Sequence, residues 1–122
     1  MKYDFLTRIC HIYKSCFKIL KYVNDYDDGD VFDDTGKTDA ILWNLSIIGE
    51  AASQLLKAYP EVISDFPEIP WSDMRTTRNR IMHGYDTLDI DNVRDTVRDD
   101  LPPLLPKLKK IIRNANKAVG PA

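Results

Sequence analysis

Apolar residues recur every three or four positions over most of the chain, which is the period of one face of an α-helix. The first of these stripes predicts an amphipathic helix from about residue 3 to residue 23. The second predicts a wider, more apolar helix from about residue 38 to residue 59, which we expect at the centre of the core. No segment alternates apolar and polar residues over a useful length, so the pattern predicts an all-α protein with essentially no β-sheet.

The second half of the chain carries shorter stripes that are interrupted by prolines and a glycine. Three prolines between residues 60 and 70 mark a turn-rich connection, after which a short helix is expected from residue 72 to residue 83, ended by Gly84. A further helix should start at residue 89 or 91, and the Pro102-Pro103 pair should kink or restart it. The pattern therefore predicts an up-and-down bundle of about four to five helices, formed by one domain over residues 1–122.

Three residues stand out within the second predicted helix. Gly49 in its middle costs roughly 1 kcal/mol relative to Ala, so we expect a neighbouring helix to approach closely there. Asn44 and Glu50 are polar residues in an apolar neighbourhood, and structural hydrogen bonding is the expected role of both.

Six aspartates crowd into residues 25–34, inside an acidic segment, residues 25–37, that separates the first two predicted helices. The alternation of Asp25 and Asp27 is compatible with a calcium-binding loop. However, the glycine falls one place too early, and the twelfth position holds Gly36 where such loops carry a bidentate Glu. A solvated acidic loop without a metal is the better interpretation.

The composition is that of an ordinary globular protein, with 43% hydrophobic and 30% charged residues. No apolar run approaches the roughly 20 residues that span a bilayer, and the first residues lack the apolar region of a signal peptide, so we expect a cytoplasmic protein without a membrane partner. Cys10 and Cys16 lie on different faces of one predicted helix, and His11 has no second ligand at metal-binding spacing. Free thiols are therefore expected, with no metal and no cofactor.

The formal net charge of −2 would argue against a nucleic-acid partner if the charge were evenly spread. It is not, because the acidic segment holds many of the carboxylates. From residue 101 to residue 122 the chain has no acid and five basic residues, Lys107, Lys109, Lys110, Arg113 and Lys117. Binding to phosphate depends on local basic surface, so RNA stays a candidate partner.

Residues 75–85 concentrate three arginines, an amide, an imidazole and a phenol. Asn79 and His83 are four residues apart and share a helix face, which Arg78 borders through its long side chain. The five residues from Arg78 to His83 correspond to about 140° of rotation, so a single helix does not bring these two side chains together. A partner subunit or the end of the helix must help.

These residue types suit the cutting of RNA without a metal, in which the 2′-hydroxyl attacks the adjacent phosphate. The reaction needs a proton acceptor, a proton donor and positive charge on the phosphate. His83 could transfer the proton, Arg78 could hold two phosphate oxygens, and Asn79 could orient the ribose or phosphate. The residues alone also permit a plainer interpretation, because an Arg and a His near a helix end often serve surface pairing and capping.

The motif Arg78-Asn79 followed by His83 resembles the signature of the HEPN superfamily, and the extension His83-Gly84-Tyr85 resembles the R-x-x-x-x-H-x-Y form of HepT toxins. The similarity extends over most of the chain, in the family's order and spacing. It covers residues 38–41, 44–45, 47–51, 67–71 and 99–102.

The resemblance implies an all-α HEPN fold, a homodimer whose two motifs face one cleft, and metal-independent endoribonuclease activity with Arg78 and His83 catalytic and Asn79 positioning the substrate. It also implies an antitoxin partner, a minimal nucleotidyltransferase resembling MntA, which silences such toxins by adding AMP to the motif tyrosine, here Tyr85. The added phosphate would occupy the RNA pocket and cancel its positive charge.

Two departures from the family pattern concern the residues around the motif. Thr76-Thr77 replaces the small-plus-apolar pair expected before the arginine, and Arg75 and Arg80 add charge that could extend an RNA track or face solvent. A HEPN module that docks a nucleotidyltransferase or holds nucleotide or RNA without cutting is the alternative function. A plain helical interaction domain would require the motif to be coincidental.

Overall fold

The computed structural model describes residues 2–26 and 29–119, apart from the side chains of residues 2, 3, 85 and 117–119. Asp27, Asp28 and the side chains of Tyr85 and Lys117 thus lie outside the described part. Within it all regular structure is helical, which confirms the prediction of an all-α fold. The elements are α1 (Lys2–Asn24), the 3-10 turn η1 (Val31–Asp33), α2 (Thr35–Ala58), α3 (Val62–Asp65), α4 (Trp71–His83), the 3-10 turn η2 (Tyr85–Thr87), α5 (Ile90–Asp95), the π-helical segment η3 (Thr96–Asp100) and α6 (Leu101–Val119).

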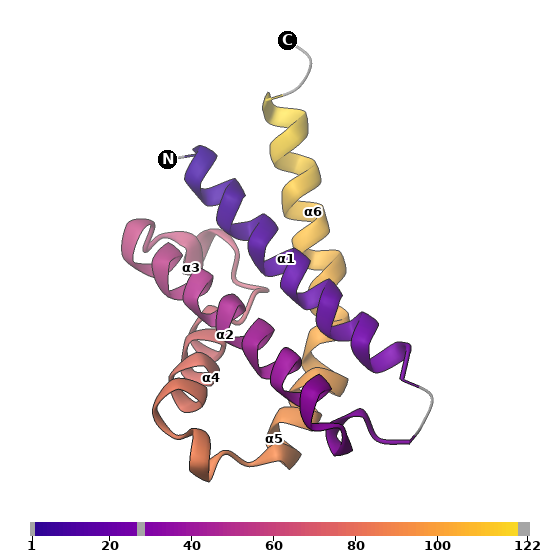
Figure 1. The fold of residues 1–122 in the computed structure, drawn as a ribbon. Coiled ribbons are helices and arrows are strands. Elements are labelled where there is room, and N and C mark those ends of the chain that lie inside the picture. The colour runs from indigo at the N-terminus through magenta and orange to yellow at the C-terminus, as the bar shows by residue number, and fades with distance from the viewer. Residues whose placement is uncertain (1, 27–28, 120–122) are drawn as a thin grey trace.

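Helix α2 is the centre of the bundle, as the sequence predicts. It packs against α1 on one side and α4 on another, and α1 also packs against α6 (Figure 1). The start of α1 and the end of α6 lie toward the same end of the molecule, whereas α4 and α5 form the opposite end (Figure 1). No helix of the described residues is both long enough and apolar enough to cross a membrane.

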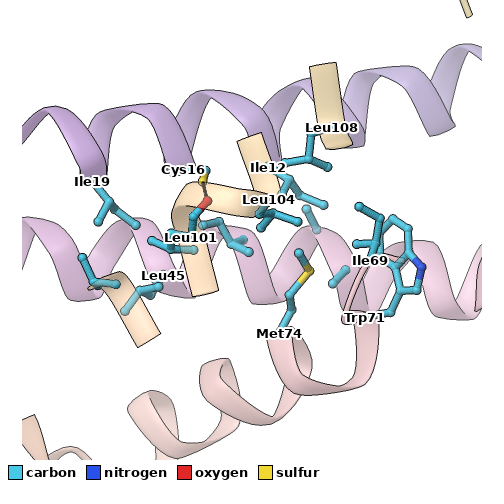
Figure 2. Close-up of a cluster of buried hydrophobic side chains, with 14 of the residues drawn as sticks. Ile12, Cys16, Ile19, Leu45, Ile69, Trp71, Met74, Leu101, Leu104 and Leu108 are labelled. Atoms are coloured by element: carbon cyan, nitrogen blue, oxygen red, sulfur yellow. Dashed lines mark hydrogen bonds between the residues drawn. The ribbon is translucent and has the colours of Figure 1, made fainter. Parts of the chain in front are cut away.

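The core draws side chains from every long helix (Figure 2). Its labelled members include Ile12, Cys16, Ile19, Leu45, Trp71, Met74, Leu101, Leu104 and Leu108. The Cys16 thiol donates to the carbonyl oxygen of Leu101 at 3.6 Å, and the Trp71 ring nitrogen donates to the carbonyl oxygen of Phe66 at 3.0 Å. Polar atoms that enter the core are therefore satisfied by backbone groups.

Helix α2 starts at Thr35, three residues earlier than expected, because Asp34 caps it. The Asp34 carboxylate accepts from the backbone N–H of Lys37 at 2.9 Å. The preceding turn is also tied down, since Asp30 accepts from the Phe32 N–H and pairs with Arg94 Nη2 at 2.8 Å. The acidic segment is thus fastened to α5 instead of being solvated throughout.

Pro102 and Pro103 lie in the first turn of α6, directly after a π-helical segment, so the helical path restarts at the prolines and does not end there. Pro102 and Pro103 offer no N–H to the carbonyls one turn earlier. Just before them the backbone widens into a π-helical segment, in which the N–H of Leu101 bonds to the carbonyl oxygen of Thr96, five residues back. Helix α6 then continues with Pro106 inside it.

Candidate active site

The motif helix α4 touches α2 at Gly49. A Cβ atom on Gly49 would lie 2.1 Å from Cβ of Arg78 and 2.6 Å from the carbonyl oxygen of Met74, which no real side chain tolerates. This confirms the close approach expected at Gly49. The same contact fixes the position from which the Arg78 side chain leaves α4.

The Arg78 guanidinium is held on α2 by a carboxylate. Its Nη2 atom lies 3.0 Å from Oε2 of Glu50, and its Nη1 atom donates to Oδ1 of Asn79 at 2.7 Å. Glu50 in turn accepts from the Gln54 amide at 2.9 Å. The Gln54 hydrogen bond, followed by the charges of Arg78 and Lys57, holds the pKa of Glu50 below its ordinary value. Arg78 keeps 30% of its side chain exposed, so its charge stays available at the surface.

His83 and Asn79 are both exposed, and His83 is the last residue of α4. Gly84 follows it, with its N–H bonded to the carbonyl oxygen of Arg80 at 2.9 Å, and the backbone of Tyr85 begins the next turn. The helix therefore ends where the sequence predicts. The structure brings Arg78 and Asn79 together. It does not bring Arg78 and His83 together, because the Arg78 side chain packs onto α2 whereas His83 lies at the end of α4, as their rotational offset predicts.

The sequence that forms this site matches a known protein family. Residues 12–111 match the family model described as "HepT-like: Ribonuclease HepT-like". The chain belongs to the HepT-like family.

Curated relatives carry consistent names. The HepT-like chain is 33% identical over 72 residues to "Probable ribonuclease HepT" of Thermococcus cleftensis, a match that covers 59% of this chain and 63% of the relative. It is 27% identical to "Gamma-glutamylcyclotransferase and putative RNase MJ0434" of Methanocaldococcus jannaschii, over 96% of this chain and 51% of the relative. It is 24% identical to "Putative RNase MJ0127" of the same organism, over 93% and 91%.

The chain thus spans about half to two thirds of the length of the first two of these relatives, and nearly all of the third. The search of solved structures found no significant match to the HepT-like chain.

Beside Arg78 the surface is hollowed, with a cavity of about 340 Å³. Its lining comes from α1, α2 and α4 and includes Arg8, His11, Trp43, Ile47, Glu50 and Met82. Trp43 and Met82 are 67% and 57% exposed, which is unusual for such large apolar side chains. The motif arginine therefore borders an open cavity with apolar and basic walls.

The two flanking arginines of α4 take other positions. Arg75 is exposed, and Arg80 lines a separate hollow of about 460 Å³ between α4 and the start of α6, together with Lys107 and several carboxylates. Arg80 is thus not part of the cavity beside Arg78. Among the described residues, no group of three or more His, Cys, Asp or Glu side chains is arranged to hold a metal ion.

Three residues of this site are not singled out by the sequence as functional. Glu50 is expected to form structural hydrogen bonds and does so with Gln54, but it also pairs with the motif arginine. His11 reads as a surface or packing residue. Trp43 could have been identified from the sequence, because it lies off the buried apolar stripe of α2 and must therefore face solvent or a partner.

Proposed function

We propose that this HepT-like chain is the toxin of a toxin–antitoxin pair and cuts RNA without a metal at a site shared by two copies of the chain. The observation that supports this is the placement of Arg78. It is anchored on α2 by Glu50, borders an open cavity, and lies on the helix that presents an exposed His83 at its end. The family and the names of its relatives support the ribonuclease part of this proposal.

The reaction uses only groups of the RNA and of the motif. An imidazole takes the proton of the 2′-hydroxyl as the 2′-oxygen bonds to phosphorus. The bond from phosphorus to the 5′-oxygen then breaks, and that oxygen receives a proton from an imidazolium. The products are a 2′,3′-cyclic phosphate and a 5′-hydroxyl. Arg78 stabilises the charge that builds on the phosphate oxygens, and Asn79 holds the guanidinium or the ribose in place.

A homodimer would complete the site. Each chain brings one motif imidazole, whereas the reaction needs a proton acceptor and a proton donor at the same time. Two motifs facing one cleft would bring two copies of His83 and of Arg78. The exposed Met82, directly before His83, suits an apolar contact between the copies at this point.

Regulation would act on the same site. An MntA-like nucleotidyltransferase would transfer AMP to the phenol oxygen of Tyr85, with loss of pyrophosphate from ATP. Tyr85 follows His83 by two residues, so the added phosphodiester would repel the RNA phosphate and compete for Arg78. Co-expression with such an enzyme should add the mass of AMP to the chain, and Tyr85→Phe should abolish the addition.

The test of catalysis is cleavage of a labelled single-stranded RNA in the presence of EDTA. The His83→Ala and Arg78→Ala variants should each lose at least about 100-fold in kcat, whereas Arg75→Ala should retain most activity. Circular dichroism and sedimentation should show that the variants keep their helices and their dimer. Equal cleavage by the unmodified protein and His83→Ala would refute the mechanism.

A tandem fusion of two copies tests the shared site. If both imidazoles act on one phosphate, a fusion with His83→Ala in one half should be about as inactive as a fusion altered in both halves. Retention of half the activity would mean that each subunit works alone.

A specific observation also favours a second function. Arg78 is already paired with Glu50, so the cavity could bind phosphate groups without cutting RNA. A chain that binds RNA or the nucleotidyltransferase tightly, yet neither cleaves RNA nor inhibits growth when expressed alone, would support this binding module.

A further inference from the structure

Helix α1 carries mainly positive charge along its exposed face; its one carboxylate, Asp4 in the first turn, pairs with Arg8 at 3.3 Å. Between Asp4 and Asp25 it contains no carboxylate, although the whole chain has 19 acids against 17 lysines and arginines. Its basic residues recur every three or four positions and so share one face. They are Arg8, His11, Lys14, Lys18 and Lys21, and all but the half-buried Arg8 are exposed. At 1.5 Å per residue this basic face is about 20 Å long, enough for several nucleotides.

The far end of the basic face opens into a hollow of about 560 Å³ between α1 and α2. Three lysines line it, Lys18 and Lys21 from α1 and Lys37 from α2. Lys21 pairs with Asp25 at 3.1 Å, and the Lys37 ammonium lies 5.3 Å from the centre of the Tyr22 ring. Three cations against one carboxylate leave this hollow positively charged.

Aromatic side chains stand beside these cations. Trp43 lines the hollow and is 67% exposed. Phe17, 51% exposed, lies outside this lining, on the face of α1 that it shares with Lys14 and Lys21. An exposed ring flanked by lysines is the arrangement on which single-stranded nucleic acids stack their bases while their phosphates meet the cations.

The hollow adjoins the candidate active site. Trp43 and Ile47 line both this hollow and the cavity beside Arg78, and Arg8 and His11 line that cavity from the near end of the basic face. A strand that lies along α1 would therefore lead directly to the motif arginine.

We infer that the basic face of α1 and the hollow around Trp43 form a binding subsite for single-stranded RNA, which holds the nucleotides on one side of the phosphate that is cut. A second copy of the chain fits this hollow poorly, because a symmetric contact would press the lysines of one copy against those of the other. The position of the cut rests on the proposed function, whereas binding itself does not.

The first experiment measures binding without cleavage. A fluorescent RNA of about 12 nucleotides is titrated against the His83→Ala protein, by anisotropy, at several salt concentrations. Adding the substitutions Lys18→Gln, Lys21→Gln and Lys37→Gln should lower the slope of log affinity against log salt by about two units. Trp43→Ala should weaken binding by about 5- to 100-fold. The matched control replaces three cations of α6 instead, Lys109→Gln, Lys110→Gln and Arg113→Gln, and should change binding little.

The second experiment uses the otherwise unmodified protein and compares substrates of two lengths. The triple lysine variant should raise KM for the long RNA while kcat for a dinucleotide stays unchanged, because a dinucleotide reaches only the cut. If the unmodified protein cuts no RNA but the lysine variants still weaken RNA binding, the proposed function fails and this inference stands.

Three results would overturn the inference. One is equal loss of affinity in the α1–α2 and α6 variants, which would mean that only total charge matters. Another is loss of the dimer in Trp43→Ala, seen by sedimentation, which would assign the hollow to a second copy. The third is unchanged RNA binding with loss of binding to the nucleotidyltransferase, which would assign it to an acidic protein partner.

Discussion

The contact between α2 and α4 makes a sharp prediction for Gly49→Ala. In an exposed helix this change stabilises a protein by about 1 kcal/mol, because Ala has the better helix propensity. Here the new Cβ would sit 2.1 Å from Cβ of Arg78, well inside the ordinary carbon–carbon contact of about 3.5–4.0 Å. Overpacking costs about 1–3 kcal/mol or more, and a clash as close as this one belongs at the upper end, so after the gain of about 1 kcal/mol the net loss should be about 1–2 kcal/mol.

Gly36→Ala is the matched control in the same helix. A Cβ there would meet only Oδ1 of Asp34, at an ordinary 3.5 Å, so the helix-propensity gain should survive. Urea denaturation followed by circular dichroism should move the midpoint down for Gly49→Ala and leave it unchanged or raised for Gly36→Ala.

The same pair of variants connects packing to function. To make room, α4 must move away from α2, and Arg78 moves with it and away from Glu50. RNA cleavage by Gly49→Ala should therefore fall even at temperatures where the variant is fully folded. A Gly49→Ala protein as stable as the unmodified one would show that the two helices are not in contact at Gly49.

Two further predictions concern single side chains. Glu50→Gln removes the charge that anchors Arg78, so kcat for RNA should fall by about 10-fold, while the midpoint of unfolding changes little because both partners are partly exposed; an unchanged kcat would remove Glu50 from the site. Burial raises the pKa of the Cys16 thiol to about 12, so it stays protonated at pH 8–9, and iodoacetamide should modify it only in urea; peptide mass spectrometry checks this, and rapid alkylation of the folded protein would contradict the burial.

The helices themselves follow closely from the sequence. The central apolar helix, the end of the motif helix at Gly84 and the restart of the C-terminal helix at the paired prolines all appear where local rules place them. The start of α2 is not predicted by local rules, because any of the six aspartates in this segment could cap a helix and only the structure shows that Asp34 does. The choice among them is made by tertiary contacts, in particular by Arg94, which reaches Asp30 from a helix 64 residues away.

The candidate site also has one part that the local sequence predicts and one part that depends on tertiary contacts. The motif residues can be found from sequence, because their types and spacing are local. The Arg78–Glu50 pair joins two helices and is decided by the contact at Gly49, so no spacing rule predicts it.

The basic face of α1 was readable from sequence, since its cations repeat at helical spacing. A count of total charge does not reveal this face, because the six aspartates that follow the helix offset its positive charge. That separation of charge has a physical consequence for the proposed binding of RNA. Apart from Asp4, which pairs with Arg8, α1 carries no carboxylate that would repel phosphate, and the packing of α1 on α2 brings its basic residues to the cavity that Arg78 borders. A slightly acidic protein can in this way present a mainly positive face, and that face leads toward Arg78, which Glu50 holds in place.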